Sequence, residues 1–219
     1  MSYELLVFDW DGTLIDSTAR IISSFQGGAR ELGLRVPPHE DVKSIIGLGL
    51  KEAIVQVMPE LNEADVDRLA QVYSRHYVEV DKTPVALFDA VEEGLHELIG
   101  SGFRLAVATG KSRRGLDRAL QESGLEHLFE TTRCADETRS KPHPMMLNQI
   151  LAQTGVSPRA TVMIGDTDYD LNMARSAGVD ALAVTYGAHP LERLQASEPT
   201  HQVDSFVEFM QWIKDHKRI

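Results

Sequence analysis

Short apolar runs recur along the chain, and each gives way to a polar or glycine-rich stretch. They cover residues 5–8, 105–108, 161–164 and 181–184. A strand that is covered on both faces has no solvent-facing side, so its residues are apolar without alternation. The pattern therefore predicts four buried strands of a parallel sheet.

Segments of helical periodicity alternate with these runs, and each segment stops at a glycine. Glycine is the usual residue just past the end of a helix. Repeated alternation of strands and helices is typical of open α/β sheets. We therefore predict an α/β fold with a Rossmann-like open parallel sheet and helices on both faces. The segments are residues 114–123, 145–154 and 171–177, followed by Gly124, Gly155 and Gly178.

The region of residues 16–85 has a different pattern, with helical periodicity and no buried-strand run. We interpret it as a small all-helical domain inserted after the first strand. The rest of the sheet and its helices, residues 1–15 and 86–219, then form the core domain. The helices expected in the insert cover residues 17–32, 37–46, 50–58 and 62–80.

Two of the expected helices carry well-defined apolar stripes. In the helix of residues 62–80, Asn62 is a suitable N-cap residue. A final amphipathic helix covers residues 204–216. The residues expected to face inward are Val66, Leu69, Tyr73, Tyr77 and Val80 in the first helix, and Phe206, Val207, Met210 and Ile213 in the second.

The composition is that of a globular protein with an acidic surface. Of 219 residues, 42% are hydrophobic, and the formal net charge is 22 − 33 = −11. An acidic surface repels nucleic acid and anionic lipid, so we expect no nucleic-acid and no membrane partner. The single cysteine, Cys134, excludes an internal disulfide and fits a cytoplasmic location, as does the lack of a signal-peptide pattern. The sequence leaves the oligomeric state unknown.

Acidic and phosphate-binding residue types follow three of the predicted strands directly. Asp9 and Asp11 come after the first strand, and Thr109 and Gly110 come after the second, at the start of a helix. Hydroxyl and free backbone N–H groups at a helix start can bind an anion. Taken singly, these segments also have the composition of polar turns and helix caps.

Further charged residues occur at the starts of later helices. Lys141 precedes one helix, and Asp166 and Asp170 follow the third predicted strand. Because the carboxyl ends of parallel strands meet at one edge of a sheet, we expect these side chains to converge. Clustered carboxylates repel each other unless a cation lies between them or some are protonated. Oxygen ligands without histidine or cysteine indicate Mg²⁺.

The ordered motifs resemble those of the haloacid dehalogenase superfamily, in its phosphoglycolate-phosphatase-like branch. They are Asp9-x-Asp11-Gly12-Thr13-Leu14, then Thr109, then Lys141-Pro142, and then Gly165-Asp166-x-x-x-Asp170. The resemblance covers essentially the whole chain, and the helical insert matches the α-helical cap of that family.

The resemblance implies a magnesium-dependent phosphatase with an aspartyl-phosphate intermediate, acting on a small phosphorylated metabolite. It implies that Asp9 is the nucleophile and that Asp11 is the general acid and base. It also implies three phosphate-binding residues, Thr109, Gly110 and Lys141, of which Thr109 and Lys141 belong to the catalytic set. The residues implied for Mg²⁺ are Asp9, Asp11 through its carbonyl, Asp166, and Asp170, which supports the metal's waters or orients Lys141.

The resemblance also places a loop of the cap over the site. Gly47 lets the backbone approach a ligand, and Lys51 could meet a carboxylate or a second phosphate of the substrate. Arg20 is a candidate of the same kind. The alternative is that Gly47 belongs to an ordinary turn between helices, with Lys51 and Arg20 on solvated surfaces.

Two other functions stay open at this point. A β-phosphoglucomutase-like mutase has the same motifs and returns the phosphoryl group to a sugar. A non-catalytic binding module has the same fold, although every expected catalytic residue is present here. The natural substrate is left open by the sequence.

Overall fold

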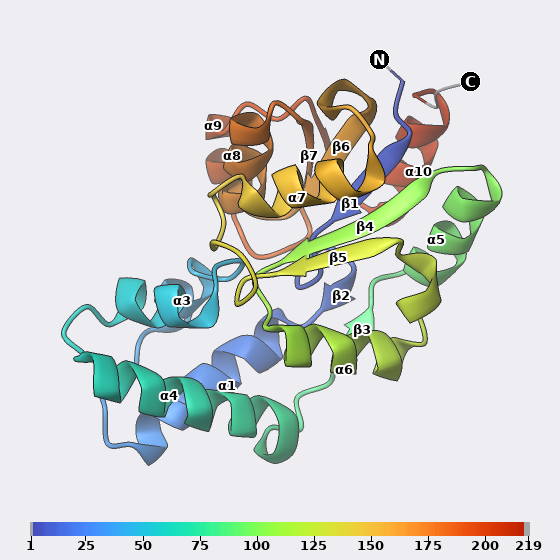
Figure 1. Cartoon of the computed structure of the whole chain (residues 1–219). Helices are drawn as coiled ribbons and strands as arrows, with labels where there is room; N and C mark the ends of the chain where they lie inside the picture. The colour runs from blue at the N-terminus through green and yellow to red at the C-terminus, as the bar shows by residue number, and fades with distance from the viewer. Residues whose placement is uncertain (1, 217–219) are drawn as a thin grey trace.

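Six parallel strands form the central sheet, and their order in space differs from their order along the chain (Figure 1). The computed structural model describes residues 2–216. The first strand lies in the middle of the sheet, paired with β4 on one side and β6 on the other. Across the sheet, the strands are β5 (Thr131–Cys134), β4 (Arg104–Thr109), β1 (Leu5–Phe8), β6 (Thr161–Gly165), β7 (Asp180–Val184) and β8 (His201–Val203).

The predicted α/β fold is confirmed, and the four apolar runs form β1, β4, β6 and β7. The hydrophobic pattern misses β5 and β8, which are the two edge strands of the sheet. Edge strands are covered less completely than central ones, so they do not need to be continuously apolar. Accordingly, Arg133 of β5 is partly exposed, and His201 and Gln202 of β8 are exposed.

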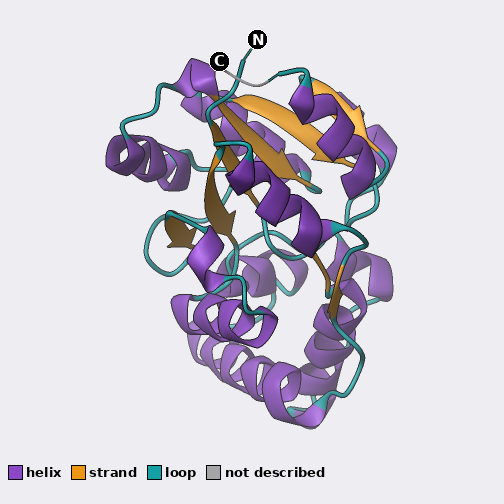
Figure 2. Ribbon diagram, turned by 90° about the vertical axis from the view of Figure 1, so that its right-hand side faces the viewer, coloured by secondary structure: helices purple, strands orange, loops and turns teal. Residues whose placement is uncertain are grey.

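Helices cover both faces of the sheet, as Figures 1 and 2 show. Alternate side chains of β1 point to opposite faces, so Leu6 and Phe8 pack on one layer and Leu5 and Val7 on the other. The first layer consists of α5 (Val91–Gly100), α6 (Arg113–Ser123) and α10 (Phe206–Lys214). The second consists of α7 (Met145–Thr154), α8 (Asp168–Ala177) and α9 (Leu191–Ala196). Two short 3₁₀ turns are η2 (Glu126–Leu128) and η3 (Pro158–Ala160).

The segment of residues 16–85, called the helical segment below, is helical as expected and packs around a separate hydrophobic cluster, which also includes Ala188 after β7. In Figure 1 it lies below the sheet and its flanking helices. The chain enters the segment through β2 and leaves it next to β3, which pair antiparallel as Ile15–Asp16 and Ala86–Leu87. Its helices are α1 (Thr18–Glu31), α2 (His39–Lys43), α3 (Leu50–Val57), α4 (Glu63–Arg75) and the π-helix η1 (His76–Val80).

Two details of the expected helices are wrong. Asn62 caps α4 as predicted, because its side chain accepts a hydrogen bond from the Asp65 N–H. Val80, however, was expected to face inward and is 47% exposed. The π-helical turn that follows α4 is wider than an α-helical turn, so the stripe does not continue to Val80. In α10, Val207 is also 47% exposed, and Phe209 is buried instead. Phe209 stands three residues after Phe206 and therefore shares its face.

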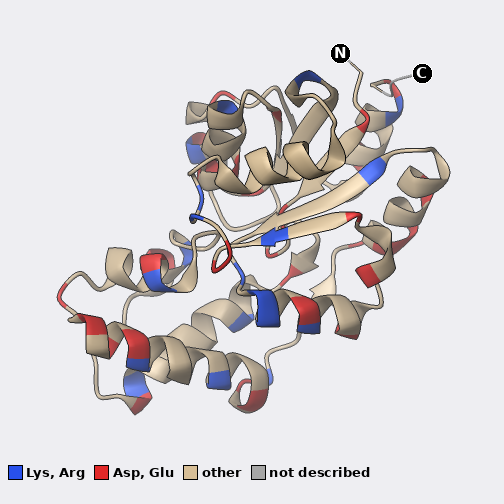
Figure 3. Ribbon diagram, in the orientation of Figure 1, with Lys and Arg blue, Asp and Glu red and all other residues tan. Residues whose placement is uncertain are grey.

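Acidic and basic residues both occur on the surfaces of several helices. Figure 3 shows acidic and basic residues interspersed along α4 and α6. Among the described residues, no helix combines the length and apolarity that crossing a bilayer requires.

We predict that Phe8→Ala lowers the free energy of unfolding by about 3–5 kcal/mol. Phe8 is fully buried on the central strand and lies against the rings of Phe206 and Phe209, at centroid distances of 6.4 and 5.7 Å. Urea unfolding followed by circular dichroism measures the loss. Val207→Ala is the control, and its effect should stay within about 0.5 kcal/mol because its side chain is exposed. Equal losses in the two variants would contradict the assignment of the core.

Candidate active site

The carboxyl ends of the neighbouring strands β1 and β6 bring the expected acidic residues together. Asp9 directly follows β1, and Asp166 directly follows β6, which is hydrogen-bonded to β1. Asp170 lies in the first turn of α8, which begins just after β6. Carboxylate oxygens of these three residues lie within 4.8 Å of one another, and all three side chains are buried. The predicted convergence of these residues is therefore observed.

Lys141 lies in this cluster, and its ammonium group pairs with two carboxylates. Its Nζ is 2.8 Å from Oδ1 of Asp9 and 2.6 Å from Oδ1 of Asp170. The side-chain exposure of the three residues is 0–1%. The second oxygen of Asp170, Oδ2, accepts a hydrogen bond from the Thr167 hydroxyl at 2.7 Å. Asp170 is thereby fixed between Lys141 and the start of α8.

Burial and mutual repulsion perturb the ionisation of this cluster. Burial raises the pKa of Asp9 well above its usual value, and Lys141 offsets only part of that rise. Burial lowers the pKa of Lys141, but Asp170 and Asp9 raise it by more, so that Lys141 stays protonated. Three buried carboxylates with a single lysine leave an excess of negative charge, which is unfavourable in a protein interior.

Asp166 is held in place by two hydrogen bonds. Its Oδ1 accepts from the Thr13 hydroxyl at 2.8 Å, and its Oδ2 accepts from the Ala188 N–H at 2.7 Å. Burial and the charge of Asp170 nevertheless raise the pKa of Asp166 to about 6. Gly12 has a φ of +81°, and a Cβ there would lie 2.1 Å from Oδ2 of Asp166. Glycine is therefore required for the loop after β1 to pass beside this carboxylate.

The cluster fits a hard divalent cation. Oδ2 of Asp9 is buried and has no hydrogen-bond partner in the part of the chain that the structure describes. A cation beside it would compensate the excess negative charge and keep Asp9 and Asp166 ionised. All candidate ligand atoms are oxygens, which suits Mg²⁺. Asp170 is already paired with the ammonium of Lys141, whereas the hydrogen-bond donors to Asp166 are neutral, so Asp170 suits the orienting role better than direct ligation.

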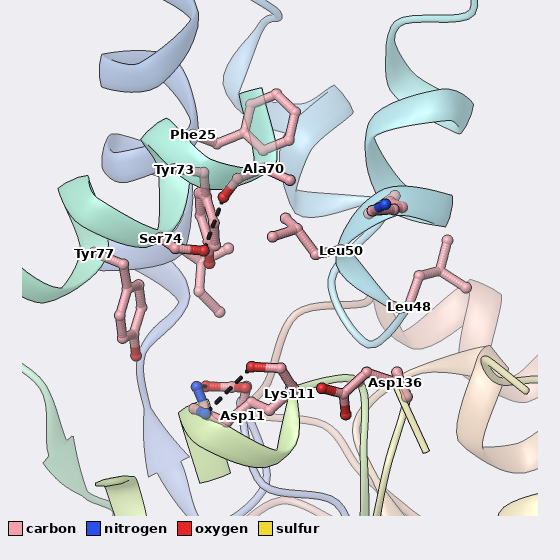
Figure 4. A pocket seen from close by; sticks show the side chains of 18 of the residues that line it. Asp11, Phe25, Leu48, Leu50, Ala70, Tyr73, Ser74, Tyr77, Lys111 and Asp136 are labelled. Atoms are coloured by element: carbon pink, nitrogen blue, oxygen red, sulfur yellow. Dashed lines mark hydrogen bonds and ion pairs between the residues drawn. The ribbon is translucent and has the colours of Figure 1, made fainter. Parts of the chain in front are cut away.

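Asp11 is bound by two groups of its own. Its Oδ1 accepts a hydrogen bond from the Ser17 hydroxyl at 2.6 Å and lies 3.0 Å from Nζ of Lys111 (Figure 4). Nζ of Lys111 also lies 4.9 Å from the centre of the Tyr77 ring. Burial lowers the pKa of Lys111, but Asp11 raises it by more, and the net shift is upward. Asp11 therefore has a permanent positive neighbour.

Lys111 is the site residue that the sequence reasoning missed. The sequence pattern identified its position only as part of a helix start that offers backbone N–H groups. Lys111 stands two residues after Thr109, on the loop into α6, and this position could have identified it as a site residue. Thr109 itself is fully buried, and its hydroxyl accepts a hydrogen bond from the Lys111 N–H at 3.2 Å.

The helical segment lies in close contact with Gly110 of the sheet domain. A Cβ on Gly110 would lie 2.5 Å from the carbonyl oxygen of Leu48 and 2.6 Å from that of Gly47. The loop between α2 and α3 therefore lies directly over the loop after β4, as the resemblance implied for residues near Gly47. The Gly49 N–H also donates to the Ser140 hydroxyl at 2.8 Å, next to Lys141.

A second contact holds the helical segment against the other side of the site. The backbone carbonyl of Ser44 accepts hydrogen bonds from the Tyr169 hydroxyl and the Arg193 guanidinium, each at 3.2 Å. It also lies 3.1 Å from Nε2 of His189. Asp168 pairs with Arg193 at 2.7 Å and with His189 at 3.2 Å, so it holds both side chains in position.

A cavity of about 910 Å³ lies between the helical segment and the sheet domain, with Asp9 and Asp11 in its wall. Gly47 and Lys51 also line this cavity, and Nζ of Lys51 pairs with Oδ1 of Asp67 at 2.6 Å. Arg20 is not brought to it. Arg20 lies at a smaller neighbouring cavity and donates to the carbonyl of Thr83 at 2.6 Å, close to the end of the helical segment.

The sequence and the fold both have known relatives. The chain is 35% identical over 208 residues to a protein of Dickeya dadantii named "Probable phosphatase IndB", covering 93% of this chain and 90% of the relative. It is 30% identical over 215 residues to a phosphoglycolate phosphatase of Colwellia psychrerythraea, covering 94% and 95% of the two chains. The fold matches a crystal structure titled as a predicted phosphoglycolate phosphatase from Haemophilus somnus, with a TM-score of 0.87, 24% identity and coverage of 97% and 98%.

The sequence profile of one family matches most of the chain. It is described as haloacid dehalogenase-like hydrolase, and it matches residues 6–184, from β1 through β7. The matched stretch contains the acidic cluster, Lys141 and the helical segment. The chain therefore belongs to the haloacid dehalogenase-like hydrolase family, and the resemblance expected from its motifs is confirmed.

Proposed function

We propose that this enzyme hydrolyses phosphate monoesters of small metabolites, with Mg²⁺ as cofactor and an aspartyl-phosphate intermediate at Asp9. The observation that supports this most is the buried carboxylate of Asp9, which is paired with Lys141 through Oδ1 and whose Oδ2 has no hydrogen-bond partner among residues 2–216. The phosphatase names of the relatives support the reaction class. The helical segment of residues 16–85 acts in this proposal as a cap over the site.

Asp9 and Asp11 divide the chemistry between them. Oδ2 of Asp9 attacks phosphorus, and the bond to the leaving oxygen breaks while Asp11 gives that oxygen a proton. Asp11 then takes a proton from a water molecule, which attacks the aspartyl-phosphate and releases inorganic phosphate and free Asp9. Asp11 is protonated when the ester binds, and the ammonium of Lys111 pairs with the carboxylate that forms when Asp11 gives up that proton. The hydrogen bond from Ser17 holds the Asp11 carboxyl in place.

The remaining residues bind the phosphoryl group and compensate its charge. Lys141, Lys111 and the N–H groups at the start of α6 supply positive potential where negative charge develops in the transition state. Asp9, Asp166 and the backbone carbonyl of Asp11 would hold Mg²⁺. When bound, the cation reduces the repulsion between the Asp9 carboxylate and the phosphate dianion. Asp170 orients Lys141.

We predict that Asp9→Asn reduces phosphate release by about 10³-fold or more, because an amide is a poor nucleophile. The measurement is inorganic phosphate release from a panel of phosphate esters with Mg²⁺, with circular dichroism to show that the fold is kept. Asp180→Asn is the matched control. Asp180 accepts a hydrogen bond from Tyr3 at the opposite end of the sheet, at 2.9 Å, and its variant should remain active. Turnover by Asp9→Asn at the wild-type rate would refute the covalent mechanism.

We predict that Asp166→Asn stabilises the metal-free protein at pH about 8, by about 1–3 kcal/mol. The pKa of Asp166 is raised to about 6 in the folded protein, so its ionised form is disfavoured there relative to the unfolded chain. The penalty is present above pH about 6 and fades as the pH falls toward the unfolded pKa of about 3.9. The stabilising effect of the variant should fade over the same range.

Thermal unfolding with and without Mg²⁺ measures both effects of Asp166→Asn. The wild-type Tm should rise on addition of Mg²⁺, and the variant's Tm should not. EDTA should stop wild-type activity, and Mg²⁺ should restore it. An equal rise in Tm for the two proteins would place the cation away from Asp166.

A further inference from the structure

The walls of the large cavity are mostly apolar on the side of the helical segment. Figure 4 shows Phe25, Leu50 and Tyr73 on one side of an open space, with Asp11 and Lys111 on the opposite side. Ile45 and Ile46 line the same cavity. A leaving group bound to a phosphoryl group at Asp9 would extend into this space, because Asp9 and Asp11 stand in the same wall.

The size of the cavity exceeds what a very small substrate needs. Its volume of about 910 Å³ is near the upper end of the range of about 300–1,000 Å³ that is common for small-molecule sites. A phosphorylated two-carbon acid would leave most of the apolar wall in contact with water. A leaving group with a ring would cover that wall.

The charges around the cavity disfavour a second anionic group on the substrate. Lys51 is paired with Asp67, and Lys111 is paired with Asp11. Arg75 and Arg118 pair with Glu31 and Glu122. Among the described lining residues, Arg114 is the cation without an ion pair, and it is exposed. Within the described part of the chain, three lining carboxylates have no ion pair, namely those of Glu52, Glu79 and Asp136. Unpaired negative charge therefore outweighs unpaired positive charge.

Three aromatic rings form a row in the helical segment. The ring centroids of Phe25 and Tyr73 are 6.2 Å apart, and those of Tyr73 and Tyr77 are 6.0 Å apart. All three residues line the cavity. Phe25 is 1% exposed, so the ring faces and edges against which a flat group can pack come from Tyr73 and Tyr77, which are partly exposed.

We propose that the leaving group of the substrate is an uncharged alcohol that carries an aromatic ring, bound between the row of aromatic residues and Leu50. This inference rests on the proposed phosphatase function and names the substrate class for the same site. In the competing arrangement, Lys51 binds a carboxylate or second phosphate, which requires its ion pair with Asp67 to break.

The test compares four esters with wild-type enzyme and Mg²⁺: ethyl phosphate, benzyl phosphate, 4-carboxybenzyl phosphate and phosphoglycolate. All four have primary alcohols as leaving groups, so differences in kcat/KM report chiefly on the contacts of the rest of the molecule. Benzyl phosphate should exceed ethyl phosphate by about tenfold or more, from burial of its ring. The added carboxylate of 4-carboxybenzyl phosphate should remove most of that gain.

Leu50→Ser tests the apolar wall directly, and Val55→Ser on the same helix is its matched control. Leu50 lines the cavity, whereas Val55 is 53% exposed and is not one of the lining residues. Leu50→Ser should lower kcat/KM for benzyl phosphate by about 3–10-fold and change that for ethyl phosphate by less than about twofold. Val55→Ser should leave both values unchanged. A purely structural effect of Leu50→Ser would lower kcat/KM equally for both esters.

The outcomes separate this inference from the proposed function. Suppose that ethyl phosphate is hydrolysed, but kcat/KM for phosphoglycolate or 4-carboxybenzyl phosphate equals or exceeds that for benzyl phosphate. The proposed substrate class is then wrong, while the phosphatase function stands. If Leu50→Ser affects ethyl and benzyl phosphate alike, the proposed binding place of the ring is wrong. If none of the four esters is hydrolysed, the proposed function fails, and the inference fails with it.

Discussion

The ammonium of Lys141, buried between the carboxylates of Asp9 and Asp170, is the interaction on which the rest of the site depends. It holds the Asp9 carboxylate in position, which the proposed mechanism requires of its nucleophile. A buried charge without a partner is costly, so each member of this group constrains the positions of the others. The excess negative charge that remains, from Asp166 together with Asp9 and Asp170, is what makes the site suitable for a divalent cation.

The helical segment completes this site rather than forming a separate one. Its loop of residues 47–49 lies against Gly110 and Ser140, and the Ser44 carbonyl is bound by side chains from the helices after β6 and β7. Most of these contacts are polar, and the hydrophobic cluster of the segment includes Ala188 from outside it. Such an interface permits opening and closing, which a site that exchanges substrate and product requires.

Much of the site could be predicted because its residues follow strands that the apolar pattern identifies. Asp9 and Asp166 come after β1 and β6, and neighbouring parallel strands bring their ends together regardless of separation in the chain. Lys111 could not be assigned a role in this way. Its neighbour Asp11 and the ring of Tyr77 come from different elements, and neither proximity follows from sequence spacing.

The sequence by itself determined the central strands, the position of the helical segment and the set of acidic residues at one edge of the sheet. Each of these follows from local periodicity and from the geometry of parallel strands. The tertiary structure alone decided the edge strands β5 and β8, the outward direction of Val80 and Val207, and the pairing of Lys51 with Asp67. These features depend on which surfaces meet in space, and hydrophobic periodicity does not encode such long-range contacts.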